Sequence, residues 1–128
     1  MRVSPRPGQV SELPVPLTRR EAELLDRVVV SPVCQYSTHG VATDWQLAHL
    51  GSQVVGGAGT VLTAATAVSP TRRISPLDLG VWTDEQADVF GCVASFVCEH
   101  GSVPGIRLAH AGRKVSTAPP WEGGHPVA

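Results

Sequence analysis

The chain has 128 residues, which is enough for one ordinary domain. Its 10 basic and 11 acidic residues give a formal net charge of −1, so neither a nucleic-acid-binding surface nor an acidic tail is indicated. Residues 1–16 combine prolines with polar residues and lack an apolar stretch of signal-peptide length, and no later run is long enough to span a bilayer. We therefore expect a cytoplasmic protein without membrane contact, whose three cysteines are reduced thiols.

The first predicted element is a strand within residues 26–33, "DRVVVSPV". A short apolar run rich in valine and bounded by proline suits a strand that is covered on both faces, as in a parallel sheet. Cys34 and Tyr36 follow two residues apart, so a continued strand would turn the thiol and the phenol into one shared space and Gln35 away from it. The alternative is a packed free cysteine beside a half-buried tyrosine.

A helix and a second strand come next. Thr43 and Gln46 have the spacing of a capping box, and the two glycines at 56–57 end the helix that it begins. The run "TVLTAATAV" (60–68) predicts a second buried strand, with small residues in its second half. A long polar loop is expected over 69–82.

The second helix begins with the same device, because Thr83 and Gln86 repeat the capping-box spacing. Its apolar residues fall at positions i, i+3, i+4 and i+7 and form one face. They are Phe90, Val93, Ala94 and Val97. Gly101 ends this helix, and "VPGIRLAHA" (103–111) predicts a third strand.

The order strand–helix–strand–helix–strand is typical of parallel strands joined by crossover helices. We expect residues 1–12 to be a loose extension and residues 13–128 to form the folded segment. The loops that follow the strands carry the polar and reactive groups, whereas the loops that follow the helices are short. Because α/β folds build their sites at the carboxyl ends of parallel strands, this pattern predicts a site there, close to Cys34 and Tyr36.

Several blocks, in order, resemble a known family: "VVVSPVCQYS", "GGAGTVLTAATAV", "RRISPLDLGVW" and above all "PGIRLAHAGRK". From about Leu13 to Gly124 the chain resembles the N-terminal part of the old yellow enzyme family, the NADH:flavin oxidoreductases. It is most similar to the xenobiotic-reductase-like subgroup, whose loop after the third strand resembles "RKVSTAPPWEGG". The resemblance implies an α/β fold, namely the N-terminal part of a (β/α)8 TIM barrel with about three parallel strands and two helices, incomplete.

The resemblance also implies a chemistry. Members hold FMN at the mouth of the barrel, reduce it with NAD(P)H and pass hydride to activated alkenes such as enones, or reduce quinones and nitro compounds. Tyr36 matches the family's substrate-side catalytic tyrosine, and His110 and Arg113 match the loop after the third strand. The residues that match flavin-binding positions are Ser31, Pro32, Val33, Cys34 and Ala65. No metal site is implied.

Arg107 stands where the family usually has a glutamine that hydrogen-bonds the pyrimidine edge of the flavin. Alternation on a strand places Arg107 and Ala109 on one face and Ile106 and Leu108 on the other. Our hypothesis is that Arg107 faces the flavin, where a permanent positive charge would favour the anionic reduced form. The alternative is that the bulkier arginine obstructs the pocket.

A complete barrel needs roughly 250 residues, so three strands leave apolar edges unburied and the family's histidine pair unmatched. We expect a fragment, a truncated product or half of a split enzyme, without turnover on its own. A second hypothesis is a non-catalytic interaction chain that binds a complementary barrel chain or forms a homo-oligomer. A metal module built on Cys92, Cys98 and His100 matches no zinc spacing, and the "GGAGT" glycines do not follow a dinucleotide-binding pattern.

Overall fold

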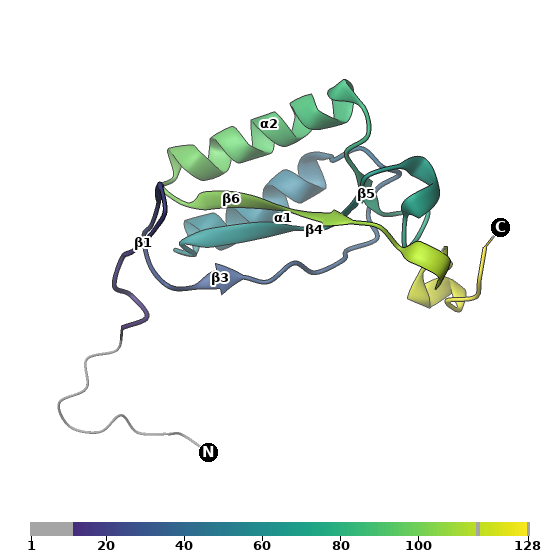
Figure 1. Ribbon diagram of the computed structural model, residues 1–128, viewed down its shortest axis with the longest axis horizontal. Coiled ribbons are helices and arrows are strands. Elements are labelled where there is room, and N and C mark those ends of the chain that lie inside the picture. The colour runs from purple at the N-terminus through teal and green to yellow at the C-terminus, as the bar shows by residue number, and fades with distance from the viewer. Residues whose placement is uncertain (1–11, 115, 128) are drawn as a thin grey trace, which may run out of the picture.

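The computed structural model describes residues 12–114 and 116–127, so the loose extension predicted for residues 1–12 lies almost wholly outside the described residues. Short strands come first along the chain, and two helices then alternate with the main strands (Figure 1). The elements are β1 (Leu17–Arg19), β2 (Ala22–Leu24), β3 (Val29–Val30), α1 (Asp44–Val55), β4 (Thr60–Ala67), η1 (Pro70–Arg72), β5 (Leu79–Gly80), α2 (Asp84–Glu99), β6 (Val103–Ala109), η2 (Gly112–Lys114) and η3 (Pro120–Glu122).

Both helices begin at the predicted capping boxes. The side chain of Thr43 accepts a hydrogen bond from the Trp45 backbone N–H, and Gln46 Oε1 accepts one from the Thr43 N–H at 2.7 Å. Thr83 and Gln86 repeat this exchange at the start of α2. Each pair satisfies backbone donors that the first turn of a helix leaves free. The predicted helix starts are therefore confirmed, and both capping boxes form as their spacing in the sequence indicates.

The central strand of the sheet is β4. It pairs in parallel with β3 through Val29–Thr60 and, along its other edge, with the whole length of β6. A register shift interrupts the β4–β6 ladder between Leu62 and Ala65. Beyond β3, the carboxyl end of β4 pairs in parallel with the short strand β5. The three main strands β3, β4 and β6 are thus neighbours in chain order, as in the first part of a parallel barrel.

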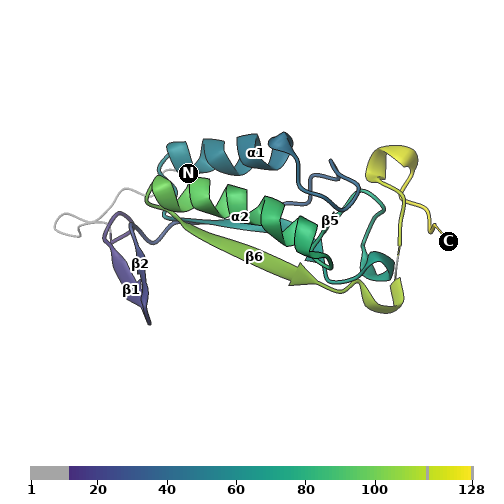
Figure 2. The ribbon, with the colours of Figure 1, turned by 90° about the horizontal axis from the view of Figure 1, so that it is seen from above.

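Helices α1 and α2 lie side by side on one face of this sheet (Figure 2). They bury an apolar core against β4, formed by Leu50, Val54, Val61, Val93 and Val97. Within the described residues, the opposite face of the sheet carries no helix. This one-sided cover is the arrangement of a barrel wall, with helices outside and the second face turned to the interior.

The sheet does not close among the described residues. β6 pairs only with β4, and Ile106 and Leu108 on β6 are 44% and 62% exposed. This agrees with the expectation that an incomplete barrel leaves an apolar strand edge uncovered. No helix in the described part of the chain is long and apolar enough to cross a membrane.

Two features differ from the sequence predictions. Of the strand expected over 26–33, only Val29–Val30 form a strand, namely β3. Val29 is half exposed instead of covered on both faces. Pro32 has no backbone N–H to donate to a ladder, which ends the pairing of this run with β4. Residues 31–39 form no ladder with β4, and Gly40 then forms an isolated bridge to Leu79 on β5.

The predicted loop over 69–82 contains η1 and β5, and a β1–β2 hairpin precedes β3. Neither was predicted. The hairpin turn is formed by Arg20, whose φ of 55° is unusual for a residue other than glycine. The second and third main strands, by contrast, end only one and two residues before their predicted limits.

Candidate functional site

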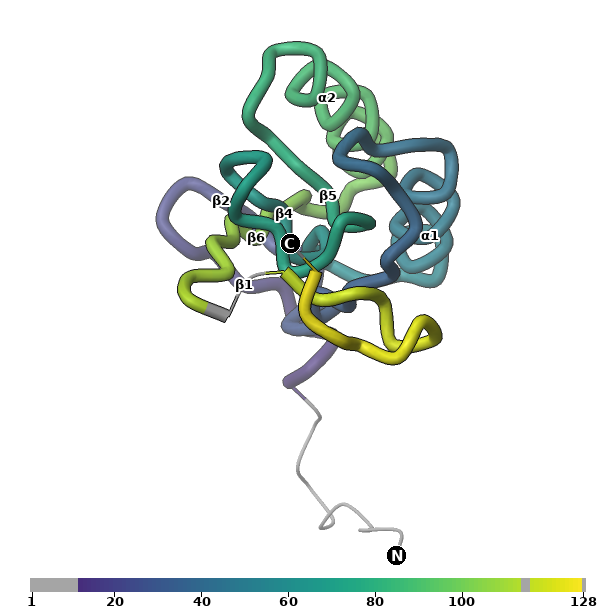
Figure 3. The backbone as a smooth tube through the Cα atoms, turned by 90° about the vertical axis from the view of Figure 1, so that its right-hand side faces the viewer, coloured from purple at the N-terminus to yellow at the C-terminus, as the bar shows by residue number. Residues whose placement is uncertain are grey.

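The carboxyl ends of β3, β4 and β6 point to the same end of the molecule (Figure 1, right). Three loops gather there, formed by residues 31–43, 68–83 and 110–127. Figure 3 looks onto this end and shows the C-terminal segment lying across it. The end at which the sequence predicts a site is therefore built from segments that are distant in the sequence.

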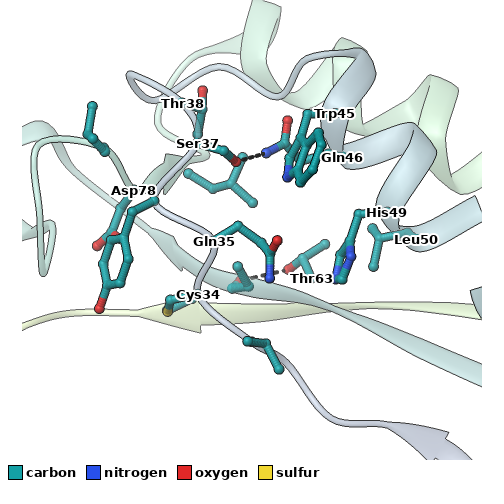
Figure 4. A pocket seen from close by; sticks show the side chains of 16 residues that line it. Cys34, Gln35, Ser37, Thr38, Trp45, Gln46, His49, Leu50, Thr63 and Asp78 are labelled. Atoms are coloured by element: carbon teal, nitrogen blue, oxygen red, sulfur yellow. Dashed lines mark hydrogen bonds between the residues drawn. The ribbon is translucent and has the colours of Figure 1, made fainter. Parts of the chain in front are cut away.

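The two capping glutamines hold the segment that follows β3. Gln46 Nε2 donates to Ser37 Oγ at 2.9 Å (Figure 4), and Gln86 Nε2 donates to the Gly40 carbonyl oxygen at 3.2 Å. Both glutamine side chains are buried. The Gly40 oxygen also accepts from the Gly80 N–H at 2.8 Å. Side-chain amides thus replace the missing ladder and fix the segment that carries Cys34 and Tyr36.

Cys34 and Tyr36 do not lie on a strand, so the predicted reason for their proximity is wrong. Tyr36 has a φ of 47°, in the left-handed region that residues with a Cβ rarely adopt. Figure 4 shows Cys34 and Gln35 pointing to opposite sides of the segment, and Gln35 faces α1. The thiol and the phenol remain close enough for a charge on Cys34 to act on Tyr36.

Burial raises the pKa of the Tyr36 phenol, and negative charge on Cys34 and on Asp78 raises it further. The phenol therefore stays protonated throughout the neutral range and can donate a hydrogen bond. Trp121, on η3, meets the Tyr36 ring edge-on, with 6.0 Å between the ring centroids. An aromatic pair thus stands at the carboxyl end of the sheet.

Asp78 lies buried beside this pair. Its Oδ2 accepts hydrogen bonds from the backbone N–H groups of Ile74 at 2.7 Å and Ser75 at 3.1 Å. Burial raises the pKa of the Asp78 carboxyl, although these two bonds and the charge of Arg73 act in the opposite direction. The carboxylate therefore organises the 74–78 turn, which supports the C-terminal segment.

A small cavity of about 20 Å³ separates residues 33–38 from α1 (Figure 4). Gln35, Trp45 and His49 are among its lining residues. A space of this size holds about one water molecule. It is a packing seam on the helix side of the segment, so a larger ligand would have to lie on the other side.

Residues 12–120 match the NADH:flavin oxidoreductase / NADH oxidase family over most of the chain. The chain belongs to the old yellow enzyme family. Similar proteins include the NADPH dehydrogenase of Bacillus subtilis, 43% identical over 102 residues that cover 77% of this chain and 30% of the relative. The NADPH dehydrogenase of Listeria welshimeri is 45% identical over 98 residues, covering 74% of this chain and 29% of the relative.

Solved structures of the old yellow enzyme family share the fold. Morphinone reductase in complex with tetrahydroNAD superposes with a TM-score of 0.75 at 29% identity, covering 84% of this chain and 29% of that one. The Old Yellow Enzyme from Pichia sp. gives a TM-score of 0.73 at 27% identity, covering 81% and 28%. The predicted fold class is thus confirmed. The chain spans less than a third of the length of these relatives.

The family implies a flavin, and the residues at the strand ends fit one in part. Ile106 lines the space under α2, so alternation along β6 turns Arg107 to the face without helices. The Arg107 side chain is exposed and forms no hydrogen bond or ion pair with the described residues. Five free N–H donors fit the carbonyl oxygens on the edge of a flavin ring.

The other predicted flavin-binding residues differ in accessibility. Ser31 and Val33 are exposed, and Pro32 and Cys34 are half-buried, so the segment offers backbone and thiol contacts. Ala65 pairs with Arg107 in the β4–β6 register but is itself buried. Ala65 therefore adds little volume below this face of the sheet, and its side chain is not exposed for direct contact with a flavin.

Sequence reasoning did not single out Trp121 or Asp78 as site residues. Trp121 follows the Pro-Pro pair of a loop that was expected to be irregular, and only the folded chain shows its contact with Tyr36. Asp78 lies directly before β5, within the segment 69–82 that was predicted to be a loop. No spacing in the sequence relates either residue to Tyr36.

Proposed function

We propose that this chain provides the first part of the FMN-binding surface of an NAD(P)H oxidoreductase of the ene-reductase type. When bound, FMN supplies hydride transfer from NAD(P)H to an acceptor such as an enone, a quinone or a nitro compound. The observation that carries the proposal is the unpaired guanidinium of Arg107. It lies on the face of the sheet without helices, in register with Ala65.

The roles of the side chains follow from their chemistry. Arg107 would hold the edge of a bound flavin through its N–H donors, and its permanent charge would favour negative charge there. Cys34 would contribute a polarizable sulfur to the same surface. The Tyr36 hydroxyl, whose pKa is raised by burial, is protonated at neutral pH and would donate a hydrogen bond to a carbonyl oxygen of the acceptor.

Turnover needs the further strands of a complete barrel, carried by the same polypeptide or by a second chain. A second candidate function is therefore an interaction chain that pairs with a complementary barrel part. The open edge of β6, with Leu108 62% exposed, favours this candidate.

Two further proposals concern the electron donor and the cellular compartment. Relatives named NADPH dehydrogenase favour NADPH as the electron donor. All three cysteines are free thiols, which suits a reducing compartment such as the cytoplasm.

The proposal is tested by titrating the purified chain with FMN, following the quenching of flavin fluorescence, with gel filtration alongside. We expect saturable binding to a species of defined size. Arg107→Gln should weaken the binding of FMN roughly tenfold, equivalent to about 1.4 kcal/mol. Arg19→Gln, on the hairpin at the opposite end of the sheet, is the matched control and should leave the affinity unchanged.

Absence of saturable FMN binding by a soluble, folded chain would contradict the first candidate. Equal affinities for Arg107→Gln and the unmodified chain would remove Arg107 from the site. Tighter binding would mean that the arginine obstructs the pocket. Gel filtration tests one form of the second candidate, self-association through the β6 edge: a larger species of defined size would support it, and a well-behaved monomer would contradict it.

A further inference from the structure

The C-terminal loop of residues 116–127 is a closed, hydrogen-bonded unit. Thr117 and Pro126 form an antiparallel bridge, Ala118 N–H donates to the His125 oxygen at 2.9 Å, and Val127 N–H donates to the Ser116 oxygen at 2.8 Å. We call these residues the Trp121 loop. Its short helix η3 presents Trp121 outward on a framework that its own backbone holds.

The Trp121 loop is anchored to the body of the protein. Thr117 N–H donates to the Ile74 carbonyl oxygen at 2.8 Å, and the Asp78 carboxylate accepts from the Ile74 N–H. Ala118 is buried at this attachment. The position of Trp121 is thus defined relative to the 74–78 turn. In the same turn, the Leu77 carbonyl oxygen accepts a hydrogen bond from the Thr38 N–H. One turn holds both the loop and the segment that carries Tyr36.

Tyr36 needs such support. Its backbone lies in the left-handed region, at a φ of 47°, and an aromatic residue persists there only where its surroundings hold it. Among the described residues, Trp121 is the one whose ring contacts the Tyr36 ring. Trp121 is itself 64% exposed, so one part of the indole meets the tyrosine and the rest remains open.

We propose that Trp121 is a positioning residue for Tyr36: the Trp121 loop places the indole edge-on against the phenol, fixes the direction of its hydroxyl group and forms one wall of the acceptor site. The proposal rests on the proposed function for the role of Tyr36, but not for the contact itself. The open part of the indole offers a flat apolar surface, which favours planar, conjugated acceptors.

The chain allows a direct test because Tyr36 is its only tyrosine, among three tryptophans. In the unmodified chain, with selectively labelled aromatic residues, we expect a nuclear Overhauser effect between the tyrosine ring and one indole. Ultraviolet absorbance of tyrosinate then reports the pKa of Tyr36 alone. Trp121→Ala exposes the phenol, so the raised pKa should fall toward the ordinary value of about 10. Cys34 and Asp78, the charged neighbours, stay in place.

Two further variants complete the test. Trp121→Phe keeps an aromatic edge and should retain the raised pKa. Trp45→Ala removes another exposed indole, which has no ring contact with Tyr36 among the described residues, and should leave the pKa unchanged.

An unchanged pKa in Trp121→Ala, or an equal fall in all three variants, would overturn the proposal. If Trp121→Ala does not fold, absence of the nuclear Overhauser effect in the unmodified chain, or loss of the raised pKa in Trp121→Phe, would do the same. FMN titration of the unmodified chain, carried out separately, tests the proposed function. Its failure would leave the tyrosine–indole contact standing, so the two results are distinguishable.

Discussion

The two capping glutamines allow a sharp comparison, because they make the same cap but face different partners. Gln86 Nε2 donates to the Gly40 carbonyl oxygen, which can only accept. Gln46 Nε2 donates to the Ser37 hydroxyl, which can rotate and donate instead. Replacing each glutamine by glutamate keeps an oxygen for the cap and removes the amide donor. We therefore expect Gln86→Glu to destabilise the protein and Gln46→Glu to be nearly neutral.

The magnitude follows from the bonds involved. In Gln86→Glu one neutral hydrogen bond is lost and a carboxylate oxygen faces the Gly40 oxygen at the former bond distance of 3.2 Å. The Gly80 N–H still satisfies that carbonyl. The cost is about 1–2 kcal/mol at pH 7, because a lost neutral bond accounts for about 1 kcal/mol and repulsion adds to it. The favourable interaction of a carboxylate with the helix dipole applies to both variants, so it cancels in the comparison.

The pH dependence has a defined sign. The new carboxyl of Gln86→Glu is buried and can donate to Gly40 only when protonated, so its pKa in the folded state should rise above the ordinary value of about 4.3. The stabilisation from the hydrogen bond that the protonated carboxyl donates is then fully present below pH 4, and it is lost as the pH rises through the raised pKa. Urea denaturation of both variants between pH 4 and pH 8 measures this. Equal losses in both variants at pH 7, or a gap that does not narrow at low pH, would refute the reasoning.

Two further predictions concern the frame that supports the site. Asp26 Oδ1 accepts from the Gly59 N–H at 3.1 Å, so Asp26→Ala should cost about 1–2 kcal/mol in urea denaturation, whereas Asp26→Asn keeps an oxygen there and should stay within about 0.5 kcal/mol. Gly80→Ala places a methyl group 1.9 Å from the Trp82 ring and should lower the free energy of unfolding by about 1–3 kcal/mol. Gly91 is exposed on α2 with no atom near the position of an added Cβ, so Gly91→Ala should raise it by about 0.5–1 kcal/mol. Thermal melts that rank the two variants the other way would contradict this packing.

Local signals explain what the sequence could predict. Thr43 with Gln46, and Thr83 with Gln86, mark helix starts through contacts only three residues apart. The strand over 60–68 is a run of small, apolar and β-branched residues without charge, and such runs form central strands wherever partners lie on both edges. These elements depend on their own residues, so a single sequence suffices to find them.

The elements that were missed depend on distant partners. β5 has only two residues and is a strand because β4 and Gly40 pair with it. β3 ends at Val30, two residues before Pro32, which has no backbone N–H to donate to a ladder. Periodicity does not reveal where the pairing of a strand ends.

The proximity of Cys34 and Tyr36 was predicted, but for a reason that the structure corrects. Cys34 and Tyr36 lie close together because the chain bends at Tyr36 and not because a strand continues through them. Ile106 lines the space under α2, and alternation along β6 then turns Arg107 to the other face. The roles of these residues toward a flavin stay predictions that the titration decides.

The glutamines at the N3 positions of the two capping boxes carry a further signal. A capping box accepts glutamate as well as glutamine, because an oxygen is all that the cap requires. Glutamine at both N3 positions therefore indicates that each amide N–H has an acceptor elsewhere. In the folded chain these acceptors are Ser37 and Gly40, in the segment that connects β3 to α1 and carries Tyr36. The choice of amide over acid thus relates two helix starts to the placement of Tyr36, and the Gln86→Glu and Gln46→Glu pair measures how strongly.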